Sequence, residues 1–348
     1  MRHDPQGLVI ELLQGWHLPL LQDSAFVDLQ HLLQRALLLR APERLLSWLA
    51  PRRPLAPQVL VASWGPDRLL GLVVSQRSNR SGSCWELRHL RLAEHGGPVA
   101  PDQPSRLSVE TALLREAIQR SRGAASWITS ASSLDDDRLA LLRQQGFQPQ
   151  RTETLWRWSP KARASQRVGW PAELQLCPLQ RRNAPLLWHL EQAACPAHLR
   201  QLLDRRVEDL LDHTSSPSLL LIDPSRAQAV AAVRRLRHEP GDPLPELEIT
   251  LHPGWEHLLG SAVEPLLSQV ASGMEVVRLR SDVLDQPRNG WLRGLGLRPE
   301  GEEVLMARSV WRRQEPQPSH QAARRLEAML ESWQPRRRPL PTPVLQPR

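Results

Sequence analysis

The chain has 348 residues, of which 41% are hydrophobic. That is enough for two domains of ordinary size with their own cores, and it excludes a disordered polymer. Three cysteines (Cys84, Cys177 and Cys195) are too few for a disulfide-dense scaffold, which fits a reducing compartment. The sequence contains no long uncharged apolar run and no signal-like leader, so we expect a cytoplasmic protein without a membrane span.

The formal net charge of +8 is typical of proteins that meet a polyanion. However, Lys161 is the only lysine and tyrosine is absent, whereas Arg, Pro and Trp are abundant. This profile is typical of a coding bias that fills surface positions with Arg. We therefore expect a solvated basic surface, and nucleic acid is only an alternative partner.

Hydrophobic periodicity predicts alternating strands and helices along the first half of the chain. Gly65-Pro66-Asp67 marks a hairpin turn, Asp135 is placed to cap a helix, and Gly146 to end it. Strands are expected at 8–13, 59–63, 69–74, 85–92, 126–129 and 152–158, and helices at 26–39, 43–49, 109–118 and 135–145.

A polar segment at 160–171 is the expected linker, and the pattern then repeats. Strands are expected at 174–176, 219–222, 229–235, 246–251, 274–279 and 303–310, and helices at 184–194, 199–211, 258–270 and 290–295. The segments LALLRQQGFQPQRTETLWRW and GWLRGLGLRPEGEEVLMARSVW correspond to each other in the two halves. The repeat predicts a duplicated domain, with boundaries at 1–159 and 172–313.

A tail follows at 314–348. Apolar residues recur at helical spacing between 319 and 333, which predicts one amphipathic helix. Beyond residue 335 the sequence is basic and rich in proline, and we expect an extended end.

The stretch 246–270 is the central strand-turn-helix unit of the second half. An alternating strand is broken at His252-Pro253-Gly254, and a helix is expected from Leu258. A strand that delivers the chain to a helix N-terminus presents free N–H groups, which bind anions such as phosphate. The candidate cofactor-binding residues are those around this helix start: Leu251, Leu258, Leu259, Gly260 and Ser261.

The order of elements in both halves resembles the GNAT (Gcn5-related N-acetyltransferase) family. LLRQQGFQPQ and LRGLGLRPEG look like the family's helix that ends in LY-x-x-x-GF, and LEITLHP with LLGSAVEPLL looks like its central strand, phosphate loop and helix. The resemblance covers about 1–158 and 172–313. It implies an α/β (α+β) fold of two tandem domains, each a mixed, mostly antiparallel sheet flanked by helices. It also implies acyl transfer from acyl-CoA to an amine.

Both halves depart from the family's phosphate motif, (R/Q)-x-x-G-x-(G/A). If Gly260 is the last glycine, Trp255 takes the Arg/Gln position and Leu258 that of the middle glycine. In the first half the matching positions are Ser105, Ser108 and Glu110. The family's acid, a tyrosine, is replaced by Leu142 and Leu292, and the Asn common at the start of that helix by Asp135 and Asp285.

Glu86, in WELRHL, stands where the family often has a strand carboxylate, so the resemblance makes it the candidate catalytic base. The alternative is that Glu86 pairs with Arg88 or Arg91 on a solvated face. Glu248 is the weaker candidate in the second half. No metal site is expected, because the spacing of the candidate ligands fits no zinc pattern; these are His189, Cys195, His198 and His213.

Two functions stay open. The first is a GNAT-like N-acyltransferase that uses acetyl-CoA or another acyl-CoA and an amine-bearing substrate. The second is a catalytically inactive GNAT-fold module that binds a nucleic-acid or protein partner. Retained CoA binding favours the first, and steeply salt-dependent binding to nucleic acid favours the second.

Overall fold

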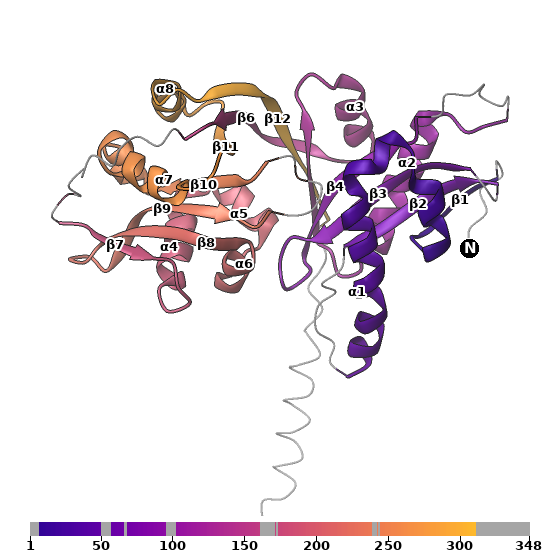
Figure 1. Ribbon diagram of the computed structural model, residues 1–348, viewed down its shortest axis with the longest axis horizontal. Coiled ribbons are helices and arrows are strands. Elements are labelled where there is room, and N and C mark those ends of the chain that lie inside the picture. Colours follow the sequence, from indigo (N-terminus) through magenta and orange to yellow (C-terminus); the bar gives the residue numbers. More distant parts are fainter. Residues whose placement is uncertain are drawn as a thin grey trace, which may run out of the picture. The chain divides into compact units, whose positions relative to one another are not determined.

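The fold is taken from a computed structural model (Figure 1). The structure describes residues 7–49, 57–65, 68–94, 102–160, 171, 173–238, 242 and 244–310. Residues 1–309 belong to one compact unit. The tail at 314–348 with its expected helix, and most of the linker at 160–171, lie outside the described residues.

The first half begins with a strand and three helical segments, and continues as a meander of strands with two further helices. Its elements are β1 (Leu8–Leu12), η1 (Gly15–Leu21), η2 (Ser24–Leu29), α1 (Gln30–Leu49), β2 (Gln58–Trp64), β3 (Leu69–Arg77), β4 (Cys84–Leu92), α2 (Arg106–Arg120), β5 (Ser126–Ser132), α3 (Asp136–Gln144) and β6 (Gln148–Trp158).

The second half repeats this order with shorter helices. Its elements are β7 (Gln175–Pro178), α4 (Ala184–Ala194), α5 (Ala197–Leu203), α6 (Val207–Asp212), β8 (Thr214–Asp223), β9 (Gln228–Leu236), β10 (Glu246–Leu251), η3 (Pro253–Trp255), η4 (Leu259–Val263), α7 (Glu264–Val270), β11 (Val277–Asp282), α8 (Gln286–Gly294) and β12 (Arg298–Ser309).

All the strands described join one sheet, in the order β1-β2-β3-β4-β5-β12-β6-β11-β10-β9-β8-β7. The pairs β4/β5 and β10/β11 are parallel, and the other neighbours are antiparallel. The expected mixed, mostly antiparallel sheet with flanking helices is therefore confirmed, and the two halves share it.

The closing strands are exchanged between the halves. β12, from the end of the second half, pairs with β5 of the first, and β6 pairs with β11 of the second. The two exchanged strands also pair with each other at the centre, where the yellow β12 of Figure 1 lies. Each half thus completes its core with a residue from the other: Met306 of β12 is buried among first-half residues, and Trp156 of β6 among second-half residues.

A turn between β3 and β4 also connects the halves. The side-chain amide of Asn79 donates to the carbonyls of Leu203 and Asp204, each at 3.1 Å. Beside it, the Arg80 guanidinium donates to both carboxylate oxygens of Asp212, at 2.5 and 2.6 Å. Asn79 is only 5% exposed, so its amide depends on hydrogen bonds within the protein, to these carbonyls and to the Ser83 hydroxyl at 2.8 Å.

Two helical segments differ from the expectation. The helices expected at 26–39 and 43–49 are a 3₁₀ segment followed by one continuous helix, α1. The helix expected at 199–211 is divided into α5 and α6, because Asp204 adopts a left-handed conformation (φ 44°) that ends the first of them. No helix in the described part of the chain is long and apolar enough to cross a membrane.

Candidate active site

The parallel strands of each half separate toward their carboxyl ends. The β4/β5 ladder joins Cys84–Glu86 to Ser126–Ile128, and the β10/β11 ladder joins Glu246 and Leu247 to Arg278 and Leu279. Beyond these residues each strand presents peptide groups to the gap instead of to its parallel neighbour. Ligands of open α/β sheets bind outside the carboxyl ends of the strands, so each gap is a candidate binding site.

The first half adds a bulge in β4. The register with β3 shifts between Val74, opposite His89, and Ser75, opposite Leu87, so Arg88 is the extra residue. In the second half β9 and β10 pair without a shift. Bulges are frequent next to active sites, because they redirect side chains out of the regular alternation.

Glu86 lies on β4 just before the strands separate, and it is half-buried. Its carboxylate accepts a hydrogen bond from the side-chain amide of Gln76 on β3, at 3.3 Å. Arg88 pairs instead with Asp242, and Arg91 with Asp28. The ion pair with Arg88 or Arg91, the alternative to a catalytic role, is thus not what the structure shows for Glu86.

The counterpart of Glu86 in the second half is Glu246. In the parallel ladders, Glu86 is paired with Ile128 and Glu246 with Arg278. Ile128 precedes the helix cap Asp135 by as many residues as Arg278 precedes the helix cap Asp285. The carboxylate of Glu246 is held by Arg280 at 2.8 Å. Burial raises the pKa of Glu246, although the charge of Arg280 opposes the shift.

Glu248, the weaker candidate, belongs to a buried ion-pair network. Arg234 is 1% exposed and donates to Glu248 at 2.5 Å and to Glu191 at 2.7 Å, while Thr250 donates to Glu191 at 2.9 Å. Burial alone would raise the pKa of Glu248, but the combined positive charges of Arg234, Arg205 and Arg151 outweigh it, and the pKa is lowered. A carboxylate held ionised by a buried arginine is a poor proton acceptor.

The expected cofactor residues of the second half fall into two groups. Leu251 and Leu258 are buried in the hydrophobic core, and Leu259 packs partly against it. Gly260 and Ser261 are exposed, and a Cβ on Gly260 would meet no atom within 4 Å. The segment is not a regular helix start, because it forms a π-helical turn, η4, ahead of α7.

The loop before this turn hydrogen-bonds to itself. The N–H of Gly254 donates to the His252 ring, that of Trp255 to the His252 carbonyl, and that of Leu259 to the Glu256 carbonyl. These three N–H groups are therefore already paired. The exposed Glu256 adds a negative charge next to any bound anion.

The first half presents a regular helix at the matching place. α2 begins after Ser105, whose hydroxyl accepts from the N–H of Ser108 at 3.2 Å, and its first turn has no acidic residue. Arg106, the first helical residue, is exposed there. A helix of this length with a basic first turn and no acidic residue in it favours an anion more than the second-half segment does.

Several solved structures resemble most of the chain. A GCN5-related N-acetyltransferase from Sphaerobacter thermophilus has a TM-score of 0.55 and 14% identity, over 88% of this chain and 96% of its own. A tandem GNAT protein from the clavulanic acid biosynthesis pathway has a TM-score of 0.52 and 14% identity, over 87% and 98%. The chain has a tandem GNAT fold.

A putative acetyltransferase from Pyrococcus horikoshii is also similar to this tandem GNAT fold, with a TM-score of 0.51 and 9% identity over 88% of this chain and 91% of its own. No protein-family model matches the sequence, and no curated protein matches it. At such identities the likeness concerns the fold, and activity has to be argued from the site.

In this GNAT fold, leucines stand at the two positions that match the family's tyrosine acid. They are Leu142 and Leu292, and both are buried in the cores, at 2% and 1% exposure. Asp135 and Asp285 cap the helices α3 and α8 through the N–H of Arg138 and Arg288. Both aspartates thus have a structural role.

His89, which sequence reasoning missed, lies on β4 beyond the end of the parallel ladder. It follows the bulge in β4, and its Nε2 is buried without a hydrogen-bond partner. Burial and the nearby charges of Arg88 and Arg91 lower the pKa of His89 to about 4, so its imidazole is neutral at pH 7. The sequence carries no mark of the bulge that places it there.

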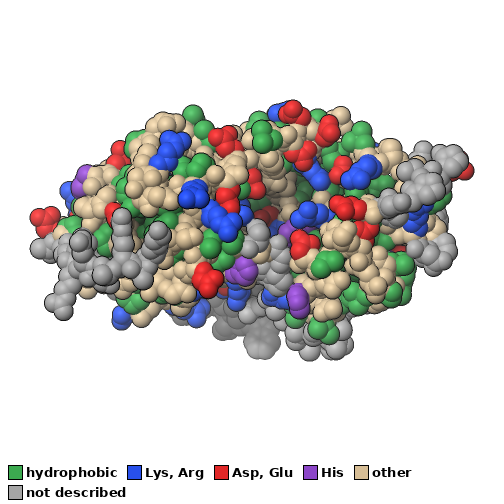
Figure 2. Space-filling model, turned by 45° about the horizontal axis from the view of Figure 1, so that its top comes forward, with side chains coloured by type: hydrophobic (Ala, Val, Ile, Leu, Met, Phe, Trp, Pro, Cys, Tyr) green, Lys and Arg blue, Asp and Glu red, His purple; other side chains and the backbone are tan. Residues whose placement is uncertain are grey.

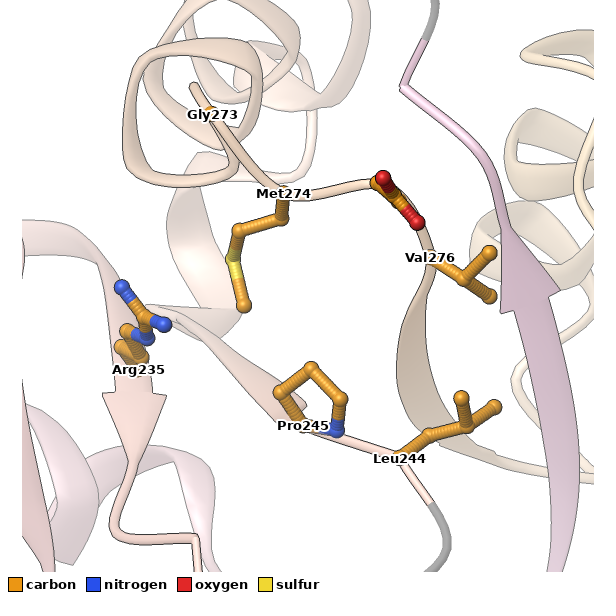
Figure 3. A pocket seen from close by; sticks show the side chains of 7 residues that line it. Arg235, Leu244, Pro245, Gly273, Met274 and Val276 are labelled. Atoms are coloured by element: carbon orange, nitrogen blue, oxygen red, sulfur yellow. The ribbon is translucent and has the colours of Figure 1, made fainter.

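A shallow pocket lies at the opposite end of β10 and β11 (Figure 3). It is lined by Arg235, Leu244, Pro245, Gly273, Met274, Glu275 and Val276. Because it adjoins the amino ends of the parallel strands, it is remote from the gap and its helix start. Within the described residues no group of three or more His, Cys, Asp or Glu side chains is placed to hold a metal ion.

Proposed function

We propose that the chain is a GNAT-like N-acyltransferase made of two tandem domains, 1–159 and 172–313, that uses acetyl-CoA or another acyl-CoA. The observation that carries this is the separation of parallel strands beside a helix start, which occurs in both halves. The cofactor supplies the thioester when bound. The acceptor is an amine-bearing substrate.

The first half is the better candidate for the active one. It combines the regular helix start at Ser105, the bulge in β4 and a carboxylate, Glu86, that is hydrogen-bonded to Gln76 and pairs with no arginine among the described residues. Glu86 would take the proton from the attacking amine. The group around Gly260 is the alternative cofactor site, which Leu251, Leu258, Leu259 and Ser261 would complete mainly through their backbones.

The test is a thermal melt with and without millimolar acetyl-CoA. A ligand at about 100 times its Kd adds about 2.7 kcal/mol of stability, which appears as a higher midpoint. Ser108→Glu places a negative charge at the α2 start, where a helix tolerates it, and Gly260→Glu does so in open space in the second half.

Each outcome assigns the site. A shift lost in Ser108→Glu and kept in Gly260→Glu supports the first half, and the reverse supports the second half. If the wild type shows no shift, the proposal fails. Release of the CoA thiol in the presence of a panel of primary amines then tests transfer, and Glu86→Gln should slow it by about 10²-fold or more without removing the shift.

A second function, binding without catalysis, is favoured by the two buried leucines at the acid position. A nucleic-acid partner is less favoured, since basic and acidic side chains are interspersed on the face drawn in Figure 2. Several arginines in the described part of the chain are paired with carboxylates, such as Arg80 with Asp212 and Arg280 with Glu303. Salt-dependent binding to a nucleic acid, unaffected by CoA, would support this second function.

A further inference from the structure

An arginine spans the gap between the separated strands in each half. The Nη2 group of Arg138, on α3, donates to the carbonyl of Leu90 on β4 at 3.1 Å. The Nη1 group of Arg288, on α8, donates to the carbonyl of Ile249 on β10 at 3.3 Å. These carbonyls lie beyond the parallel ladders, so the guanidinium takes the place of a strand partner.

The two contacts are equivalent. Arg138 and Arg288 are both the third residue of a helix whose N-cap is an aspartate, Asp135 or Asp285. Counted from the equivalent residues Glu86 and Glu246, Leu90 lies one residue farther along its strand than Ile249. The extra residue is the bulge in β4, so the two carbonyls hold equivalent positions. The halves differ in loop, bulge and carboxylate environment, yet they share this contact.

Each arginine also forms an ion pair with a carboxylate. Arg138 pairs with Glu110 of α2 at 3.3 Å, and Arg288 with Asp285 at 3.1 Å. The contacts of Arg138 are incomplete, because its Nη1 is buried without a hydrogen-bond partner among the described residues, whereas the Nε of Arg288 is 3.1 Å from a carboxylate oxygen of Asp285. An unpaired buried N–H weakens the closed position, and about a fifth of each side chain stays exposed, so it has a route to solvent.

We propose that Arg138 and Arg288 are latches that keep the gaps closed and lower the affinity for a chain-like ligand with amide groups. Such a ligand can pair with the strand edge only after the guanidinium has left the carbonyl. The inference rests on the proposed acyl-CoA function and adds the residues that limit access to it.

The size of the effect follows from the fraction of open molecules. The apparent Kd equals the intrinsic Kd divided by the open fraction, so a latch as strong as one charge-assisted hydrogen bond lowers affinity on the order of tenfold or more. Titration calorimetry with acetyl-CoA compares the wild type with Arg138→Met and Arg288→Met. Arg143→Met is the control, since Arg143 is exposed on the same helix as Arg138.

Replacing the latch arginine of the active half with methionine should lower the Kd for acetyl-CoA about tenfold. Arg143→Met should leave the Kd unchanged. A higher Kd in that variant would make the arginine a binding residue and overturn the latch, as would an unchanged Kd. Hydrogen–deuterium exchange of residues 88–92 without ligand is the second readout. It should be faster in Arg138→Met than in Arg143→Met.

This second readout separates the two proposals. If no variant binds acetyl-CoA, the proposed function fails, and equal exchange rates in Arg138→Met and Arg143→Met would overturn the latch as well. Faster exchange confined to Arg138→Met would support the latch, and the ligand that the latch limits would then be something other than acyl-CoA.

Discussion

Glu86 and Glu246 hold the same place in the two halves of the sheet, but their neighbours differ in charge. The Glu86 carboxylate meets the neutral amide of Gln76, and the Glu246 carboxylate meets the guanidinium of Arg280. A carboxylate fixed by an arginine must give up that ion pair to accept a proton. At this position of the described sheet, the carboxylate of the first half is therefore without an arginine partner, whereas that of the second half has one.

Substituting the two glutamates should therefore have unequal effects on catalysis. Glu86→Gln should lower the rate of CoA release with an accepted amine by about 10²-fold or more, because a general base is lost. Glu246→Gln should leave most of the rate. Steady-state kinetics measure both, and equal losses in the two variants would contradict the assignment.

The stability of the fold should depend on pH through His89. The pKa of His89 is about 4 in the folded chain, below its ordinary value of 6.5, so the unfolded chain binds the proton more readily between these values. Stability is then full above pH 6.5 and is lost as the pH falls toward 4, with an upper bound of about 3 kcal/mol. Urea unfolding at several pH values should show this slope, and His89→Gln should remove most of it.

Removing the buried guanidinium of Arg234 should be costly. Arg234→Met leaves Glu191 and Glu248 close together without their cation, which we expect to lower the free energy of unfolding by about 3–5 kcal/mol. The triple variant that also carries Glu191→Gln and Glu248→Gln should recover much of the loss. Chemical denaturation decides, and a triple variant no better than Arg234→Met would argue against the ion-pair explanation.

Asn79 should be important for the contact between the halves. Asn79→Ala leaves the carbonyls of Leu203 and Asp204 without this donor, and we expect a loss of about 1–3 kcal/mol. Ser81→Ala, at an exposed position in the same turn, is the control and should change stability by less. Urea midpoints of the two variants compare them directly.

The exchanged strands predict that neither half folds alone. A fragment of residues 1–159 lacks β12, so β5 loses its neighbour, the first core loses Met306, and Trp156 has no second-half core to enter. We expect this fragment to show no cooperative unfolding by circular dichroism. Mixing it with residues 172–313 should restore a complex that elutes near the size of residues 1–313. A stable, monomeric 1–159 fragment would contradict this.

The sequence by itself determined the kind of elements, their order and their duplication. Alternation and helical spacing are local signals, and the match between the segments before β6 and β12 shows the repeat without any coordinates. The departures around Gly260 and the absence of tyrosine were also plain, since they depend only on residue identity. Glu86 was singled out in the same way.

Only the tertiary structure decided which partner each residue meets. Strand alternation is the same whether β12 pairs within its own half or with β5, so the exchange leaves no local signal. The bulge at Arg88, the pairing of Glu248 with Arg234 and the contact of Arg138 with Leu90 depend on residues far apart in the chain. Their energies come from burial and charge in three dimensions, which residue order alone does not contain.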